Sequence, residues 1–233
     1  TNDNNALVFK VNKLAWGKLD NKKSNVFFGR NAGNNPGIGN HNIAIGDNTL
    51  RHYRKSFNVA IGDSVLYACT EDVFNSHSFN TGIGNIALRN TTTGSSNTAC
   101  GAAALYFNTT GYFNSGFGAS ALNDNITGND NTAVGTAALY KCRTGSFNTA
   151  LGSGALGAIY MSDVGDGNTV LGSYADVANE LIFNSMAIGF NTLVDQSNKV
   201  RIGDDNIQSI GGKVNWTAFS DSRFKKNVQA NVA

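Results

Sequence analysis

The chain has 233 residues, of which 15% are charged, 27 are glycine and one is proline. A net charge of +2 without a basic run argues against nucleic acid as a partner. No apolar stretch approaches the roughly 20 residues that span a bilayer, so no membrane insertion is expected. Cys69, Cys100 and Cys142 form no Cys-x-x-Cys motif and no cluster with histidine, so neither a metal site nor a cofactor is predicted.

Residues 1–24 precede a long repeat and are predicted to form an N-terminal cap or connector. The segment "LVFKV" (7–11) is expected to be a strand that covers the first coil, and Trp16 is expected to plug that coil. Repeat proteins need such caps because an open strand edge would otherwise pair with another chain.

From residue 25 onward the sequence repeats with a period of 17 residues. The copies align on a glycine, and six of the ten intervals between consecutive glycines are 17 residues long. Longer intervals contain extra residues, "ACTEDVFNSHSF" (68–79) and "AIYMSDVGDG" (158–167). The aligned glycines are Gly29, Gly46, Gly62, Gly84, Gly101, Gly118, Gly135, Gly152, Gly172, Gly189 and Gly203.

Other columns of the repeat keep a constant distance from this glycine. An apolar residue precedes it in every copy, and a leucine follows four residues after it in most copies. An asparagine stands four residues before it, at Asn25, Asn42, Asn58, Asn80, Asn97, Asn114, Asn131, Asn148 and Asn168. We interpret this asparagine column as a ladder of side-chain amides that bond to one another and to the backbone of turns.

Each copy alternates large and small residues before the glycine, which predicts a short strand with one buried face. The following "AAL" predicts a second short strand, and a Thr-Gly segment predicts the return turn. The sequence therefore predicts an all-β fold, a parallel β-solenoid (β-roll) of about eleven coils over residues 25–203, stacked about 4.8 Å apart. The predicted core residues are Ile45, Ile61, Ile83, Phe117, Val134, Leu151, Leu171, Ile188, Leu105, Leu122 and Leu139.

A small residue stands two positions before the glycine in most copies, as at Ala44, Gly82 and Ala133. We interpret this column as a place where another surface approaches closely. Since a 17-residue coil encloses little core, we expect three identical chains to pack round an axis and to cover apolar surface that one chain leaves exposed.

The remaining side chains offer little chemistry. The histidines lie near turns, where a surface role is commoner than a metal on a trimer axis, and the acidic pairs lie in loops without an acid–base partner. Aromatic residues at turns either stack on sugars or pack between coils and chains, and the insertions at 67–79 and 157–167 are better candidates for recognition. The histidines are His41, His52 and His77, and the acidic pairs are Glu71/Asp72, Asp163/Asp166 and Asp204/Asp205.

The repeats resemble a known family. The stretch "NTTGYFNSGFGASALNDNITGNDNTAVGTAAL" (108–139) resembles the repeat shafts of bacterial and phage tail-fibre proteins. The segments "NVAIG", "NTAVG" and "SMAIG" are similar to the core of the β-roll heads of trimeric autotransporter adhesins. The resemblance covers roughly residues 25–228 and implies a homotrimeric fibre.

Residues 204–219 are predicted to be a connector, and residues 220–233 resemble the start of another domain. The motif "SDSRFKKN" (220–227) resembles the entry to the intramolecular chaperone domain of endosialidases and other tail fibres. In that family a Ser-Asp bond can be cut once, which implies Ser220 as nucleophile, Asp221 as its neighbour and Lys225 as base. The rest of that domain does not follow, so Ser220 is expected to be structural here and no catalytic residue is predicted.

The expected function is structural and adhesive. A tail-fibre segment of a phage or a phage-like contractile injection system would present a multivalent surface to a glycan or protein receptor and join other fibre or baseplate proteins. This reading places the chain on a virion tail or an extracellular fibre, and the alternative is a trimeric adhesin head on a bacterial surface. A polysaccharide depolymerase would need paired carboxylates within regular coils, and an ice-binding solenoid would need an unbroken threonine array; neither pattern is present.

Overall fold

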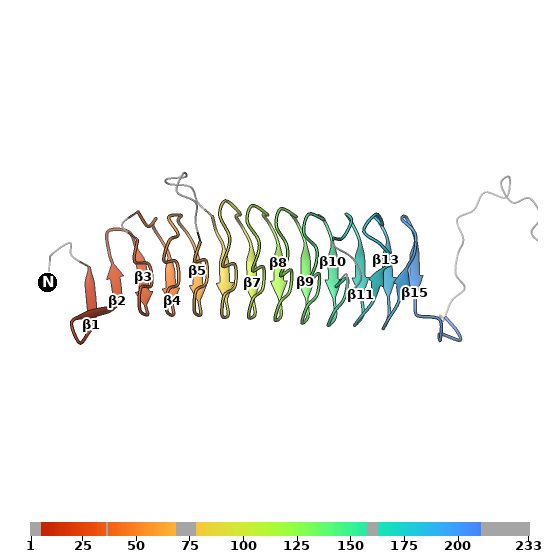
Figure 1. Ribbon diagram of the computed structural model, residues 1–233, viewed down its shortest axis with the longest axis horizontal. Helices are drawn as coiled ribbons and strands as arrows, with labels where there is room; N and C mark the ends of the chain where they lie inside the picture. Colours follow the sequence, from red (N-terminus) through yellow and green to blue (C-terminus); the bar gives the residue numbers. More distant parts are fainter. Residues whose placement is uncertain (1–5, 36, 69–77, 158–162, 211–233) are drawn as a thin grey trace, which may run out of the picture.

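The computed structural model describes residues 6–35, 37–68, 78–157 and 163–210. These residues form no helix, and Figure 1 shows a rod in which successive coils stack along one axis. A 13-stranded sheet, here called the long sheet, runs the length of the rod, and a separate pair of strands accompanies it near the C-terminal end. The predicted all-β parallel solenoid is confirmed.

The long sheet contains one short strand from each coil. Each strand pairs in parallel with the strand of the next coil and in the same register, so that Thr132 faces Thr149 and Val134 faces Leu151. This register keeps equivalent residues at the same place in every coil. The strands are β3 (Asn25–Phe28), β4 (Ile43–Ile45), β5 (Val59–Ile61), β6 (Thr81–Ile83), β7 (Thr98–Cys100), β8 (Ser115–Phe117), β9 (Thr132–Val134), β10 (Thr149–Leu151), β11 (Thr169–Leu171), β13 (Met186–Ile188) and β15 (Val200–Ile202).

An N-terminal hairpin covers the first coil. Strands β1 (Leu7–Val11) and β2 (Leu14–Asp20) are antiparallel, and β2 pairs antiparallel with β3. The expected strand at 7–11 is therefore present, but it is exposed along its length and the strand that pairs with the first coil is β2. The prediction that Trp16 plugs the coil is wrong, because 42% of this residue is exposed. Phe27 fills the end of the coil instead, with Gly33 packed against its ring.

The second predicted strand is wrong for most coils. The "AAL" residues form a tight turn in which the leucine has a positive φ, 52° at Leu105 and 51° at Leu139, and its side chain is fully buried. A left-handed leucine is unfavourable in isolation. Here the turn stacks on the next coil, since the backbone N–H of Leu105 donates to the carbonyl of Ala121. Among the residues that the structure describes, a second strand forms only at β12 (Asp176–Val177) and β14 (Leu193–Val194).

The core of each coil contains the asparagine, the small residue and the leucine. Leu105, Leu122 and Leu139 are fully buried, as predicted. The small residues face this same interior, so their assignment to contact with another surface is wrong. At Gly82 a β-carbon would lie only 2.5 Å from the side chain of Val65, so even alanine would crowd this position and a larger residue would not fit.

The apolar residue directly before the glycine does not belong to this core. Side chains alternate along a strand, and the asparagine and the small residue occupy the inward positions, so the residue between the small residue and the glycine faces outward. The predicted core was therefore wrong for Ile61 and Ile188, which are partly exposed, and for six residues that are 36% to 52% exposed. These six are Ile45, Ile83, Phe117, Val134, Leu151 and Leu171.

The repeated glycine permits the coils to stack closely. Gly135 has a φ of +132°, and a β-carbon there would lie 2.5 Å from the carbonyl oxygen of Gly152 in the next coil. Side chains other than hydrogen are therefore excluded from this column by both backbone conformation and space.

The asparagine ladder is confirmed. The Asn131 side chain is fully buried, and its Oδ1 accepts hydrogen bonds from the backbone N–H of Asn148 at 3.0 Å and from Nδ2 of Asn148 at 3.2 Å. Its Nδ2 donates to the carbonyl of Gly145, in the return turn of the same coil, at 2.8 Å. The buried Asn131 thus forms hydrogen bonds with the asparagine of the next coil and with a turn of its own coil, so its polar groups are not left unpaired.

Candidate functional site

The outward side of the long sheet carries an apolar surface that runs along the described chain. We define the apolar face as the column of residues directly before the repeated glycines. Most of its members are more than a third exposed, and the column follows the rod through all of its coils. They are Phe28, Ile45, Ile61, Ile83, Cys100, Phe117, Val134, Leu151, Leu171, Ile188 and Ile202.

The N-terminal hairpin extends the apolar face beyond the first coil. Gly17 in β2 pairs with Phe28, and a β-carbon at Gly17 would lie 2.8 Å from the Phe28 ring, so this ring lies over the glycine. The Phe9 ring lies 5.4 Å from the Phe28 ring, measured between centroids. Leu7 is 57% exposed and Phe9 is 42% exposed. The hairpin therefore continues the apolar face.

An apolar surface of this length is unusual on a single chain. At about 4.8 Å per coil the column is roughly 50 Å long. Soluble monomers rarely expose contiguous apolar patches larger than a few hundred Å². The column is regular, since the same backbone position recurs at each step, and an identical chain could match it step by step.

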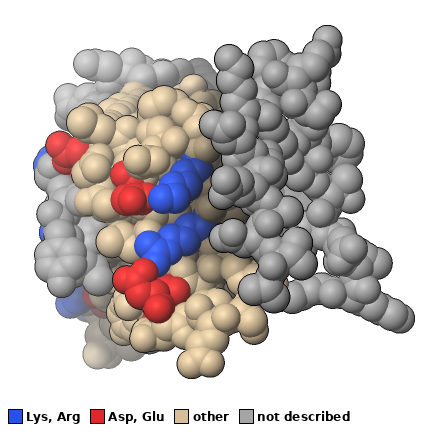
Figure 2. Space-filling view, turned by 90° about the vertical axis from the view of Figure 1, so that its right-hand side faces the viewer, with Lys and Arg blue, Asp and Glu red and all other residues tan. Residues whose placement is uncertain are grey.

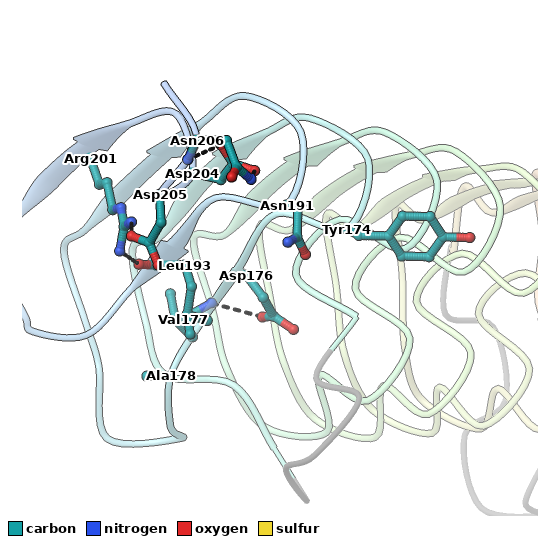
Figure 3. Close-up of a pocket in the computed structure, with 10 residues that line it drawn as sticks. All are labelled: Tyr174, Asp176, Val177, Ala178, Asn191, Leu193, Arg201, Asp204, Asp205 and Asn206. Atoms are coloured by element: carbon teal, nitrogen blue, oxygen red, sulfur yellow. Dashed lines mark hydrogen bonds and ion pairs between the residues drawn. The ribbon is translucent and has the colours of Figure 1, made fainter. Parts of the chain in front are cut away.

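A hollow of about 480 Å³ lies near the C-terminal end of the rod, beside β12, β14 and β15. Arg201 pairs with Asp205 and donates to the carbonyls of Leu193 and Gly203, at 3.0 and 3.2 Å. Figure 3 shows the Arg201 and Asp205 side chains turned toward one another, while the Tyr174 side chain points away from them. Figure 2 shows the same close mixture of basic and acidic side chains at this end of the molecule. These charges are already matched within the chain.

The acidic pairs that the sequence singled out serve the local backbone where the structure describes them. The Asp163 carboxylate accepts from the backbone N–H groups of Arg143, Thr144 and Val164 and from the Thr144 hydroxyl. Partial burial raises the pKa of Asp163, but these hydrogen bonds outweigh burial and hold the pKa below its ordinary value. Asp163 therefore holds a turn together as a carboxylate.

Asp204 has a comparable local role. Its carboxylate accepts from the backbone N–H and the side-chain amide of Asn206, both at 2.9 Å. These hydrogen bonds, led by the one from the side chain, lower the pKa of Asp204. The pair Glu71/Asp72 lies outside the described residues.

The histidines and cysteines are dispersed over the rod. His41 stacks on Phe57 with 4.7 Å between ring centroids, whereas His52 contacts Tyr67. Cys142 is buried, and burial raises the pKa of its thiol. No group of three or more His, Cys, Asp or Glu side chains that could hold a metal ion occurs within the described ranges. His77 and Cys69 lie outside those ranges.

Two further predictions also fall outside the described residues. They concern the self-processing residues Ser220, Asp221 and Lys225, and most of the two insertions, at 69–77 and 158–162.

No protein-family model matches the sequence, and no curated protein matches it. Among the described residues, no helix has the length and apolar character needed to cross a membrane. The fold and surface together define the chain as a β-solenoid repeat protein with an uncovered apolar face along its length.

Proposed function

We propose that this chain is a shaft segment of a homotrimeric tail fibre that presents a multivalent receptor-binding surface to a target cell. The observation that carries the proposal is the apolar face, which follows the long sheet from the hairpin to β15. The resemblance of the repeats to tail-fibre shafts agrees with it. A phage tail or a phage-like contractile injection system is the proposed parent assembly.

Three parallel chains with their apolar faces toward a common axis would cover this surface. Because the coils have a constant register, each chain would bring the same residue to the same height on the axis. A closed rotational arrangement also stops at a fixed number of copies, whereas an open one would continue to grow.

The mechanism of such a shaft is mechanical and multivalent. A stiff rod holds three copies of one binding surface at fixed separations. Once one copy has bound, the others meet a high effective concentration of receptor, so weak individual contacts give strong attachment. No turnover of the receptor is required.

Mass photometry of the purified protein tests the assembly. We expect a particle of about three times 24.6 kDa at micromolar chain concentration. The double variant Val134→Asp/Leu151→Asp, which places charges on the apolar face, should give single chains. The control Thr127→Asp changes an exposed side chain outside that face and should leave the trimer intact.

A single chain from the unchanged protein would contradict the proposed assembly, as would a trimer that tolerates both aspartates. Hydrolysis of a bacterial surface glycan by the purified protein would contradict the purely adhesive role.

The segments "NVAIG" and "SMAIG" also favour the second candidate, a trimeric adhesin head on a bacterial cell surface. Gold-labelled antibodies against the shaft distinguish the two parent assemblies in electron micrographs. Labelled fibres on particles support the tail fibre, and labelled cell envelopes support the adhesin.

A further inference from the structure

A row of aromatic and cationic side chains crosses four consecutive coils on the outside of the leucine turn. We name it the Arg–Tyr row. Each member stands one or two residues after a buried leucine, and a buried position follows closely in the coils of Arg89 and Tyr106, at Thr91 and Asn108. The row therefore lies between two inward columns and faces away from the core. Its members are His52, Tyr67, Arg89, Tyr106 and Phe107.

The members of the row contact one another continuously. His52 lies edge-on to Tyr67, with 4.9 Å between ring centroids. The guanidinium carbon of Arg89 lies 5.1 Å from the centre of the Tyr67 ring, and Nη1 of Arg89 donates to the Tyr106 hydroxyl at 3.3 Å. The Tyr106 and Phe107 rings meet at right angles, 4.6 Å apart. These contacts hold a guanidinium between two aromatic rings.

Arg89 keeps hydrogen-bonding capacity for an anion. A guanidinium carries five N–H donors, and its planar fork matches a carboxylate. Within the described part of the chain, the guanidinium of Arg89 makes one hydrogen bond, from Nη1 to the Tyr106 hydroxyl. Its Nε is shielded from solvent, so the donors that remain for a ligand are those on the two Nη atoms. The Tyr67 ring and the Tyr106 hydroxyl fix the position of the group, so little side-chain freedom would be lost on binding.

Both insertions of the solenoid begin at the edge that carries this row. Ala68, which directly follows Tyr67, is the last described residue before the first insertion. Gly157, which directly follows the buried Leu156, is the last described residue before the second. Insertions in repeat proteins gather on one face, which is often the binding face.

We propose that the Arg–Tyr row binds an acidic glycan. Sugar rings stack on Tyr67 and on the Tyr106–Phe107 pair, and a carboxylate of the glycan binds Arg89 between them. Tyr67 and Tyr106 are two coils apart, roughly 10 Å along the rod, which suits a linear oligosaccharide lying parallel to the axis. This inference rests on the proposed function, because it names the receptor class that the fibre meets.

The composition of the row favours a glycan over a nucleic acid. Nucleic acids are held mainly by many basic side chains on their phosphates. The row offers one guanidinium among four rings, and the whole chain has a net charge of only +2. An acidic glycan has single carboxylates separated by the apolar faces of its sugar rings. This spacing matches a row with one cation among four rings.

Isothermal titration calorimetry with defined oligosaccharides tests the proposal. The acidic probes are octasaccharides of hyaluronan, alginate, polygalacturonate and polysialic acid, and the neutral probe is a chito-oligosaccharide of similar length. We expect at least one acidic probe to bind and the neutral probe to bind at least about tenfold more weakly. The variant Arg89→Gln should lose about tenfold in affinity for the acidic probe, and Tyr106→Leu should lose a similar factor.

Arg143→Gln is the matched control, because it removes an exposed arginine outside the row and should leave the affinity unchanged. Circular dichroism and mass photometry verify that each variant keeps its fold and assembly. The proposal is overturned if no acidic probe binds, if the neutral probe binds equally well, or if both arginine variants behave alike. If the protein is monomeric and binds an acidic glycan, the result supports the Arg–Tyr row as a binding site and refutes the trimeric shaft. If the protein is a trimer and binds no acidic probe, the result supports the trimeric shaft and refutes the binding site.

Discussion

Replacing one buried asparagine by alanine should destabilise several coils at once. In Asn131→Ala the backbone N–H of Asn148 loses its acceptor, which is the Asn131 Oδ1 at 3.0 Å. Nδ2 of Asn148 loses the same acceptor, and the carbonyl of Gly145 and Oδ1 of Asn114 lose the donor Nδ2 of Asn131. One side chain thus serves groups in three consecutive coils.

The magnitude follows from which groups keep a second partner. Oδ1 of Asn114 still accepts from the backbone N–H of Asn131, and the carbonyl of Gly145 still accepts from the Cys142 thiol at 3.3 Å. The N–H of Asn148 keeps none, and an unpaired buried donor costs about 1–3 kcal/mol. With about 1 kcal/mol for each of the three other lost bonds, the free energy of unfolding should fall by roughly 4–6 kcal/mol, a large part of a typical 5–15 kcal/mol.

Urea denaturation followed by circular dichroism measures this loss at a fixed chain concentration, since assembly also contributes to stability. Asn129→Ala is the matched control, two residues before Asn131. It removes one hydrogen bond, accepted from the exposed N–H of Tyr112, and should cost no more than about 1 kcal/mol. If both variants lost the same free energy of unfolding, the argument that burial makes the ladder's hydrogen bonds important for stability would be refuted.

Three further changes probe the stacking, the core and a turn. Gly135→Ala should prevent close stacking and lower the free energy of unfolding by about 3 kcal/mol or more, because its β-carbon would lie 2.5 Å from a carbonyl oxygen; Gly167→Ala, which has a positive φ but open space, should cost only about 1–2 kcal/mol in the same urea assay. Leu139→Ala should cost about 2–5 kcal/mol by thermal denaturation, since the side chain is fully buried. The pKa of Asp163 is lowered from its ordinary 3.8, so its stabilising effect is complete above that value and is lost as the pH falls through the folded-state pKa. Acid titration of stability should therefore show a smaller loss below pH 3.8 for Asp163→Asn than for the unchanged chain.

The period, the glycines and the asparagine ladder could be predicted from the sequence because each follows from identical coils stacked in register. A glycine that recurs at a constant spacing marks a place where backbones approach closely, and Gly135 over Gly152 is such a contact. A recurring asparagine supplies its own partner in the next coil, as Asn131 does for Asn148. These features need no knowledge of the rest of the fold.

The direction of the strand side chains was predicted wrongly because apolar residues were assigned to the interior. Asn131 is buried and Val134 is exposed, which reverses the usual preference of each residue type. Counting in steps of two from the buried asparagine would have placed Ala133 inward and Val134 outward. The signal was present in the spacing of the asparagine and the glycine, but it conflicted with the expectation that apolar side chains lie inside.

The Arg–Tyr row could not be read from the repeat at all. Tyr67, Arg89 and Tyr106 occupy equivalent positions after a leucine, but the intervals between them differ, because the first contains an insertion. The interleaving of a guanidinium between two rings depends on the stacking distance of the coils and on side-chain conformations. The spacing in the sequence predicts that these residues share a column, but it predicts neither the distance between the coils nor the side-chain conformations.

The direction of the interstrand bonds gives the rod a characteristic response to force. The strands lie across the axis, so the hydrogen bonds between coils run along it, and a pull on one end loads them one coil at a time. Each detached coil replaces about 4.8 Å of rod with roughly 55 Å of extended chain. A tethered shaft would therefore yield by peeling from its end in long, repeated steps, and would absorb mechanical work before the next coil is disturbed.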